Sequence, residues 1–382
     1  MRRGTSVYVH FPFCARRCPY CDFATIARSP QEVPGSAYAD AVLRELEGRH
    51  TELEGRHLAS IFFGGGTPTL WDAEALGRVL AAIRAAFPTA EDELEITVEC
   101  NPSSLDRAKA RALADAGVNR LSIGVQSLSD ERLRFLGRLH DARGAIRAIE
   151  AAREHVERVS VDFIFGLPGQ DRAALLAELD ALRPFSLEHL SLYALTIEEG
   201  TPFHELRKKG RLPVATDDEY ATLFLAAEEA LGALGYEHYE VSNYARPGRE
   251  SRHNAHYWRG HAYLGLGAAA VGCLDEGVGR ARRRKNVIEP DAYLRDPLAP
   301  PAESERLDAE DLLREALMLG LRTSRGVDLA DVRERTGLDL LEARRAPIAR
   351  RMELGDLVVE DGHLRVPRSR WLSLDAIVVD LF

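Results

Sequence analysis

Strand-like and helix-like segments alternate along the first 235 residues, and this alternation constrains the possible folds more than any other feature. Short apolar segments typical of strands lie at residues 6–11, 58–63, 93–99, 120–124, 159–165 and 189–195. Amphipathic segments typical of helices lie at residues 37–46, 73–87, 106–116, 142–154 and 172–182. This repeated order predicts an α/β fold with a parallel sheet, either open and doubly wound or curved into a barrel.

Chemically distinctive residues follow the predicted strands in order. Cysteines come after the first strand and glycines after the second, Glu99 ends the third, Gln126 follows the fourth, and Asp162 lies within the fifth. Because parallel strands end at the same edge of a sheet, this order favours a site at the carboxyl rim, as in barrels.

The remainder of the chain differs in character. A helix is expected at residues 216–234, followed by a polar, aromatic stretch at 236–258 and a glycine- and alanine-rich stretch at 263–272. Proline and acidic residues at 296–304 indicate a boundary. Beyond it, helical periodicity at 309–321, 329–335 and 340–354 precedes a hairpin at 357–366 with an Asp-Gly turn. We therefore expect a core domain at residues 1–235, an extension at 236–300 and a small winged-helix-like α+β domain at 301–382.

Charge and hydropathy restrict the possible partners. The net charge of −10 argues against a nucleic-acid binder, so the carboxyl-terminal module is interpreted as a packing or docking unit. A basic run at residues 280–285 is interpreted either as a solvated loop or as an anion-binding segment. No apolar stretch is long enough for a transmembrane segment. The start, Met1-Arg2-Arg3, is interpreted as a charged terminus without an export signal, so a cytoplasmic location is expected.

Five cysteines occur, and Cys14, Cys18 and Cys21 lie close together. Such an odd, clustered set indicates metal binding rather than disulfides. Three thiolates with this spacing can hold three corners of an iron–sulfur cubane, leaving one iron free to chelate a small molecule. Zinc is the competing interpretation, but a structural zinc needs a fourth ligand. His10 is the candidate, yet it falls within a predicted strand.

The Cys-x3-Cys-x2-Cys spacing, with Tyr20 just before the last cysteine, resembles the radical S-adenosylmethionine (SAM) superfamily. The run Tyr8-x-His10-x-Pro12-Phe13-Cys14 narrows the resemblance to the family of oxygen-independent coproporphyrinogen III dehydrogenase and its heme-chaperone relatives. This resemblance extends over essentially the whole chain. It implies a partial (β/α)6, TIM-like barrel, a 4Fe–4S cluster on the three cysteines, and SAM on the open iron. A reduced cluster of this kind cleaves SAM into methionine and a 5′-deoxyadenosyl radical.

The SAM contacts follow from the residues and from the resemblance. Glycines after the second strand let backbone N–H groups approach a ligand closely, and Glu99 can accept hydrogen bonds from ribose hydroxyls or an amino group. Cys100 is interpreted as a packed thiol. Polar rim residues have the alternative of structural salt bridges or hydrogen bonds. The resemblance assigns SAM contacts to Tyr8, Tyr20, Gly65, Gly66, Thr67, Glu99, Gln126, Arg138, Asp162, Ala194 and Val271.

Three features favour the chaperone branch of this family. Phe23 stands where the dehydrogenase has a further cysteine, and Tyr8 lies too near the amino terminus for the dehydrogenase's substrate-holding extension. The run His253-Asn254-Ala255-His256-Tyr257-Trp258 matches the chaperones' HNxxYW motif. Neutral imidazole is a good axial ligand for heme iron, so His253 is the expected heme ligand, with His256 as the alternative. Arginines within residues 282–286 are candidates for pairing with heme propionates.

The sequence therefore predicts a heme chaperone that passes heme to an unidentified acceptor protein and contains a cluster with exchangeable SAM. The alternative is oxidative decarboxylation of coproporphyrinogen III to protoporphyrinogen IX. Whether the protein is an enzyme stays open at this stage. A DNA-binding regulator is disfavoured by the acidic charge.

Overall fold

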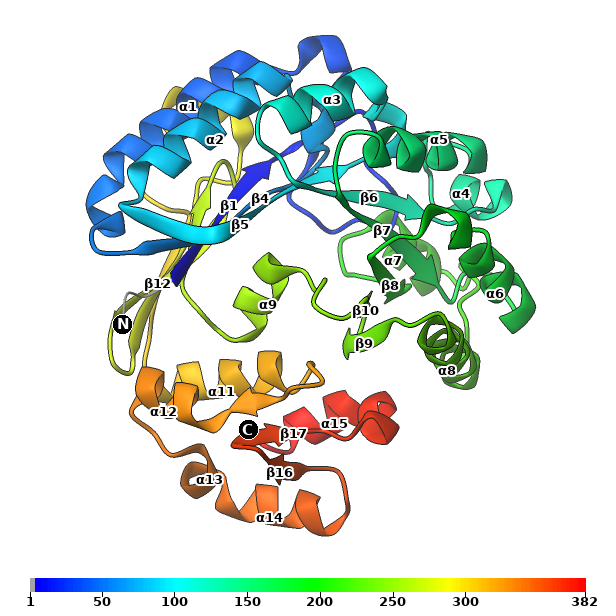
Figure 1. The fold of residues 1–382 in the computed structure, drawn as a ribbon, viewed down its shortest axis with the longest axis vertical. Coiled ribbons are helices and arrows are strands. Elements are labelled where there is room, and N and C mark those ends of the chain that lie inside the picture. The colour runs from blue at the N-terminus through cyan, green and yellow to red at the C-terminus, as the bar shows by residue number, and fades with distance from the viewer. Residues whose placement is uncertain (1–3) are drawn as a thin grey trace.

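One curved sheet of twelve strands runs through the computed structural model, which describes residues 4–382 (Figure 1). The strand order is β14-β13-β12-β11-β1-β4-β5-β6-β7-β8-β10-β9. The parallel part contains β1 (Gly4–Phe11), β4 (His57–Gly65), β5 (Thr89–Cys100), β6 (Arg120–Gln126), β7 (Arg158–Phe165), β8 (His189–Ala194) and β11 (Tyr263–Leu266). The six predicted strands are therefore confirmed. The charged start Met1-Arg2-Arg3 lies outside the described residues.

Helices cover the convex face of this sheet (Figure 1). They are α1 (Gly35–Gly48), α2 (Ala73–Ala86), α3 (Arg107–Asp115), α4 (Asp130–Phe135), α5 (Ala142–Arg153), α6 (Arg172–Asp180) and α8 (Asp217–Ala233). Helix α7 (Pro202–Lys208) instead packs beside the cysteine loop, where the N–H of Phe203 donates to the carbonyl of Pro19 at 3.0 Å. Aspartates at the N-cap positions of α2, α3, α5 and α6 accept backbone N–H groups of the first turn, which explains where these helices begin. Alternate strand residues such as Val7, Val9 and Phe11 are fully buried in the core, leaving the intervening positions to face the concave side.

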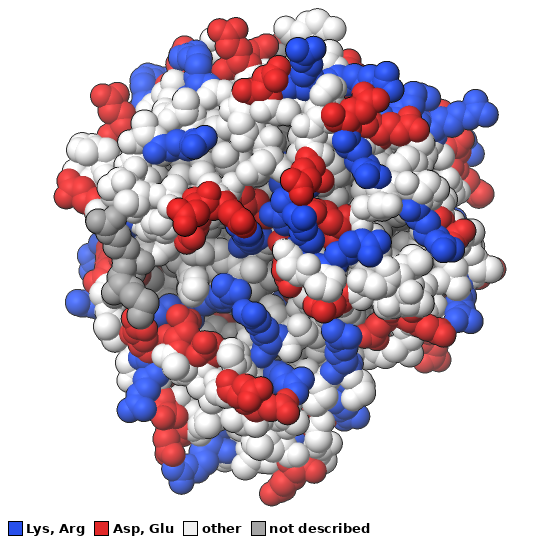
Figure 2. All heavy atoms as spheres, in the orientation of Figure 1, with Lys and Arg blue, Asp and Glu red and all other residues white. Residues whose placement is uncertain are grey.

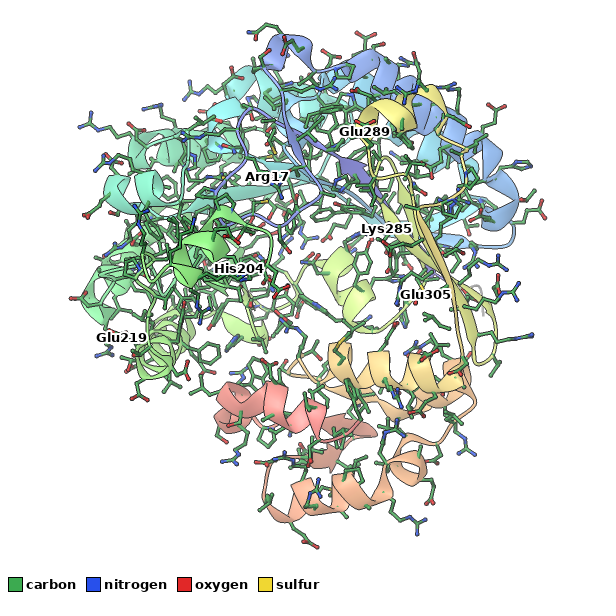
Figure 3. The ribbon with its side chains drawn as sticks, turned by 180° about the vertical axis from the view of Figure 1, so that it is seen from behind. Arg17, His204, Glu219, Lys285, Glu289 and Glu305 are labelled. Atoms are coloured by element: carbon green, nitrogen blue, oxygen red, sulfur yellow. The ribbon has the colours of Figure 1, made fainter. Side chains whose placement is uncertain are left out.

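An antiparallel ribbon extends the sheet beyond β1. It consists of β12 (Val271–Gly277), β13 (Arg280–Lys285) and β14 (Glu303–Leu307), joined to β1 through β11. The basic run is thus a strand, and its interpretation as a solvated loop is wrong. Lys285 pairs with Glu303 at 2.8 Å and Arg283 with Glu305 at 2.8 Å, so acidic residues on β14 neutralise part of the run. Figure 3 shows Lys285 and Glu305 on this ribbon.

The carboxyl-terminal module has its own core and a three-stranded sheet. Its elements are α11 (Ala309–Gly320), β15 (Val327–Asp328), α12 (Leu329–Thr336), α13 (Leu340–Ala343), α14 (Arg345–Glu353), β16 (Val358–Glu360), β17 (His363–Arg365) and α15 (Leu374–Val379). The hairpin is confirmed, with positive φ at Asp361 and Gly362, as its turn requires. The single helix expected at 340–354 is wrong. Pro347 has no N–H to donate, so it cannot continue one helix through this region. It lies in the first turn of a second helix, α14, where no such donor is needed.

This module is joined to the edge of the main sheet. The backbone N–H of Val241 donates to the carbonyl of Arg322 at 3.1 Å, and that of Ser324 donates to Tyr239 at 2.9 Å. Tyr239 belongs to β9 (Glu237–Glu240), and Val241 lies between β9 and β10 (Asn243–Ala245). Strand β14, which falls within residues 301–382, pairs with β13 of the extension. The expected domain limits at residues 235 and 300 stay predictions.

Two further helices complete the extension, α9 (Arg252–Trp258) and α10 (Pro290–Arg295). Helix α9 lies on the concave side of the sheet, between β4 and α11 (Figure 1). Acidic and basic side chains are interspersed over the face drawn in Figure 2. Of the helices within residues 4–382, none has the length and apolar character needed to cross a membrane.

Candidate functional site

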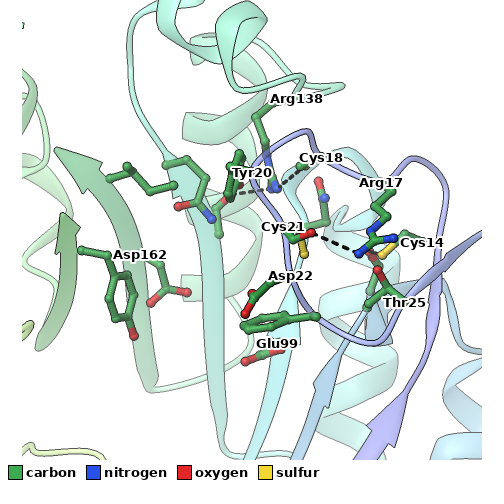
Figure 4. Close-up of a pocket in the computed structure, with 18 of the residues that line it drawn as sticks. Cys14, Arg17, Cys18, Tyr20, Cys21, Asp22, Thr25, Glu99, Arg138 and Asp162 are labelled. Carbon is green, nitrogen blue, oxygen red and sulfur yellow. Dashed lines mark hydrogen bonds between the residues drawn. The ribbon is translucent and has the colours of Figure 1, made fainter. Parts of the chain in front are cut away.

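A pocket of about 400 Å³ opens at the carboxyl ends of the parallel strands (Figure 4). The structure therefore places the chemically distinctive residues at the carboxyl rim of the sheet, as their order in the sequence predicted. Twelve of the predicted site residues line this pocket: Cys14, Cys18, Tyr20, Cys21, Gly65, Gly66, Thr67, Glu99, Gln126, Arg138, Asp162 and Ala194.

The three cysteines lie on the loop that follows β1, and none forms a disulfide. Two donors point at their sulfur atoms: Thr67 Oγ1 lies 3.6 Å from Cys14 Sγ, and Arg138 Nη1 lies 3.6 Å from Cys18 Sγ. Burial raises the pKa of the Cys14 and Cys21 thiols, so their ionised forms need a compensating partner. A metal cluster is such a partner, because metal coordination deprotonates a thiol.

The structure also bears on the choice between a cluster and zinc. His10 is the expected fourth zinc ligand, but both of its ring nitrogens are engaged. Nδ1 lies 2.9 Å from the Tyr8 hydroxyl, and Nε2 lies 2.9 Å from the carbonyl oxygen of Ala24. Over the described part of the chain, no three His, Cys, Asp or Glu side chains surround the position of a single metal ion. With His10 engaged, the donors on this loop are the three cysteine thiolates, a set that fits a 4Fe–4S cluster with one open iron.

The glycines after β4 allow close backbone approach at this loop. A Cβ atom on Gly66 would lie 2.6 Å from the carbonyl oxygen of Phe13, and one on Gly65 would lie 2.5 Å from the His10 ring. Gly65 also has φ of +107°, which disfavours any side chain. Its N–H donates to Glu99 Oε2 at 3.0 Å. Side chains here would clash with Phe13 and His10, so the glycines keep the space beside the cysteine loop open. The contacts with SAM assigned to Gly65 and Gly66 stay predictions.

Two carboxylates face the pocket from β5 and β7, the strands on either side of β6. Burial, assisted by the charge of Asp162 and opposed by the hydrogen bond from the Gly65 N–H, raises the pKa of Glu99 to about 7. Burial also raises the pKa of Asp162. Ser122, between them on β6, donates to Asp162 at 3.2 Å. Carboxylates held in this way can accept hydrogen bonds from hydroxyl or amino groups of a ligand.

Gln126 is the last residue of β6, and Arg138 lies in the loop between α4 and α5. Gln126 has φ of 67°, a left-handed conformation that is uncommon outside glycine and concentrated at functional sites. Arg138 Nη2 donates to the carbonyl of Gly124 at 2.8 Å, which holds the guanidinium beside Cys18. Burial lowers the pKa of Arg138, but Tyr20 and Cys18 outweigh this effect and raise it, so the group stays charged.

Sequence reasoning missed several pocket residues. Ser122, Tyr193 and Thr25 line the pocket but carried no motif. Alternation provides a signal for Ser122, because it lies two residues before Gly124 on the same predicted strand. It provides none for Tyr193, which is adjacent to Ala194. Thr25 has no comparable signal.

Three predicted ligand residues do not line this pocket. Tyr8 faces the concave side, where its ring stacks on Phe62 at 6.2 Å. Val271 lies on β12 and pairs with Lys285. The third, His253, lies on α9 below the pocket. Their assigned ligand contacts stay predictions.

His253 is deeply buried, with 1% of its surface exposed. Its Nδ1 lies 2.8 Å from Ser60 Oγ, while its Nε2 is buried without a hydrogen-bond partner. Phe62 stacks on the ring at 4.8 Å and Tyr257 contacts it edge-on at 4.9 Å. Burial lowers the pKa of His253 well below its usual value, so the imidazole is neutral. Neutral imidazole with a free Nε2 is the form that binds iron.

The alternative residue, His256, is differently placed. Its Nε2 lies 2.9 Å from the carbonyl oxygen of Ala262. Burial and His261 lower its pKa to about 4. That nitrogen is therefore engaged in a hydrogen bond, whereas the corresponding atom of His253 is not.

The curved parallel sheet and the three-cysteine pocket at its rim define a radical SAM protein, the class that holds a 4Fe–4S cluster and SAM. The Radical SAM superfamily model matches residues 8–182, and the HemN C-terminal domain model matches residues 307–372. The solved coproporphyrinogen III oxidase HemN of Escherichia coli, a radical SAM enzyme, has a TM-score of 0.82 and 23% identity. The match covers 100% of this chain and 90% of that one, and it shows a shared fold.

Curated relatives narrow the assignment. The chain is 36% identical over 335 residues to the heme chaperone HemW of Synechocystis sp., covering 86% of this chain and 80% of the relative. It is 34% identical over 340 residues to the heme chaperone HemW of Bacillus subtilis, covering 88% of each. The chain belongs to the HemW family of heme chaperones.

Proposed function

We propose that this protein binds heme through His253 and passes it to an acceptor protein. The observation that carries the proposal is the buried, unpartnered Nε2 of His253 within the HNxxYW run, in a chain of the HemW family. A buried polar atom without a partner calls for an explanation, and among the buried histidine nitrogens that lack one, such as Nδ1 of His140 and of His189, that of His253 lies in the HNxxYW run. An iron atom on this nitrogen would provide one, with Ser60 fixing the ring through Nδ1.

The proposal includes a 4Fe–4S cluster on Cys14, Cys18 and Cys21, with SAM beside it. When bound, the cluster supplies an electron that can cleave the carbon–sulfur bond of SAM. The chain's own part is to hold and enclose these groups. Gly65 and Gly66 allow close backbone approach, while Glu99 and Asp162 are placed to accept hydrogen bonds from SAM. Arg138 places a positive charge at one thiolate.

The enzyme alternative, decarboxylation of coproporphyrinogen III, is the less favoured one. Phe23 stands where the dehydrogenase has a cysteine, and here it lies at the pocket with 56% of its surface exposed. A phenyl ring cannot provide that cysteine's thiol chemistry. The likeness to HemN is a likeness of fold, and the same fold carries different functions.

A cytoplasmic location belongs to the same proposal. All five cysteines are free of disulfides, which suits a reducing compartment. Heme and an acceptor protein are the proposed partners, and the acidic chain is not expected to bind nucleic acid.

Two assays on the anaerobically reconstituted protein test the function. In the first, heme is titrated and its absorption followed, and we expect saturation at one heme per chain. In the second, the protein is incubated with coproporphyrinogen III, SAM and dithionite, and we expect no protoporphyrinogen IX. Formation of protoporphyrinogen IX, or failure to bind heme stoichiometrically, would contradict the proposal.

A further inference from the structure

Helix α9 begins at a buried pair of charged residues that holds the backbone on both sides of Ser251. Glu95 on β5 accepts two backbone hydrogen bonds, from the N–H of His253 at 2.9 Å and from the N–H of Arg252 at 3.1 Å. The Glu95 side chain has no exposed surface. A carboxylate at the first turn of a helix is favourable, because the N–H groups there have no partner within the helix.

Arg158 on β7 forms the other half of this arrangement. Its Nη1 donates to Glu95 Oε2 at 2.7 Å, and its Nη2 donates to the carbonyl oxygen of Glu250 at 2.9 Å. Glu188 fixes the guanidinium through Nε at 2.9 Å. Arg158 thus holds the carbonyl side of the segment while Glu95 holds the amide side. We call Glu95 and Arg158 the clamp.

The clamp has a direct consequence for His253. Nε2 of His253 is buried, with Phe62 on one face of the ring and Tyr257 at its edge, so the surrounding structure has to open before a flat macrocycle can reach this nitrogen. Movement of the first turn of α9 away from the sheet would expose it. The far end of α9 is held separately, because Arg335 of α12 donates to the carbonyl of Gly260 at 2.9 Å. Release at the clamp would therefore move His253 more than it moves the end of the helix.

We propose that Glu95 is a positioning residue for His253, and that the clamp sets the fraction of molecules in which His253 is accessible to heme. The inference rests on the proposed function, since it concerns access to the same histidine. A ligand that binds only an open state binds with an apparent affinity reduced by the fraction of open molecules. Weakening the clamp raises that fraction, so heme uptake becomes faster and tighter.

The test compares two glutamates of the same strand. Glu95→Gln keeps the size and shape of the side chain but replaces one acceptor oxygen by an NH2 donor. This donor cannot accept the hydrogen bonds that the backbone N–H groups and Arg158 give to Glu95. Glu93→Gln is the matched control, because Glu93 pairs with the Arg252 side chain at the surface and is 79% exposed. Heme uptake is followed by stopped-flow absorbance. Exchange of the amides of Arg252 and His253 with deuterium is followed on heme-free protein.

Losing one charge-assisted hydrogen bond is expected to raise both rates about tenfold in Glu95→Gln. We expect Glu93→Gln to match the wild type within about twofold, and all three proteins to reach the same final heme spectrum. Unchanged uptake and exchange in a folded Glu95→Gln protein would overturn the inference. If this variant does not fold, Arg158→Lys, which loses the forked contacts but keeps the charge, is expected to accelerate both rates.

The two measurements separate this inference from the proposed function. If the wild type takes up no heme, the proposed function fails, and amide exchange still decides whether Glu95 controls opening. If the wild type binds heme and Glu95→Gln exchanges and loads at the wild-type rate, only the clamp fails.

Discussion

Arg138 donates a hydrogen bond from Nη1 to the sulfur of Cys18, 120 residues away in sequence, at 3.6 Å. The guanidinium is held in place by a second hydrogen bond, from Nη2 to the carbonyl of Gly124 at 2.8 Å. The sequence resemblance assigns Arg138 to SAM. The structure adds that the same side chain places a positive charge directly on a proposed cluster ligand.

Arg138→Gln is expected to make the cluster's reduction potential more negative by about 60 mV, as expected for one lost charge-assisted hydrogen bond. Removing a positive charge beside a cluster disfavours the added electron. A redox titration followed by electron paramagnetic resonance measures the change. Arg134→Gln, an exposed change on α4, is the control and should leave the potential unaltered. A potential equal to or higher than that of the wild type would remove this role from Arg138.

Cys18→Ser is expected to abolish nearly all cluster binding, because two thiolates cannot hold the cubane at three corners. Iron and acid-labile sulfide are measured per chain after anaerobic reconstitution. Cys100→Ser is the control: this thiol is buried at the end of β5, where burial raises its pKa well above the usual value. Its substitution should leave iron and sulfide unchanged. A full cluster in Cys18→Ser, or zinc in place of iron in the wild type, would refute the three-thiolate site.

SAM affinity is expected to rise with pH through neutrality because of Glu99. Its pKa is raised to about 7, so the fraction of ionised carboxylate grows from about one tenth at pH 6 to about nine tenths at pH 8. Only the ionised form has both oxygens free to accept hydrogen bonds, which predicts up to about tenfold tighter binding over this interval. Calorimetric titration of wild type and Glu99→Gln at several pH values measures it. If the two proteins show the same pH dependence, Glu99 does not contact SAM.

The carboxyl-terminal module is expected to depend on one ion pair. Arg322 Nη2 lies 2.7 Å from Glu240 Oε1, and the Glu240 side chain is only 1% exposed. Arg322→Leu leaves a buried carboxylate without its cation and should lower the free energy of unfolding by about 3 kcal/mol. Arg333→Leu, which removes a surface pair with Asp339, should change it by less than about 1 kcal/mol. Urea denaturation of both variants decides the matter, and equal stabilities would contradict the assigned role.

The periodicity of apolar residues was sufficient to predict the strands of the parallel part of the sheet. Its strands are continuous apolar runs separated by amphipathic helices with aspartate caps, and these signals are local. The antiparallel ribbon was missed because its strands lack such a pattern. Strand β13 consists almost entirely of basic residues, and it is stabilised by Glu303 and Glu305 of a distant strand. A pairing of this kind depends on tertiary contacts and has no local signal.

The candidate site shows the same division. Cys14, Cys18, Cys21 and the glycines after β4 carry their signal in their spacing. The contacts that orient these residues, such as the hydrogen bond from Arg138 to Cys18, have no signal in the spacing. Nor does spacing indicate that the backbone N–H of His253 donates to Glu95, since that contact joins residues 158 positions apart.

The assignment of His253 as heme ligand is tested most directly by heme titration of His253→Ala and His256→Ala beside the wild type. The unpartnered Nε2 of His253 predicts that His253→Ala loses stoichiometric binding and the absorption of histidine-ligated heme, whereas His256→Ala keeps both. Wild-type affinity and spectrum in His253→Ala would show that the heme is held elsewhere.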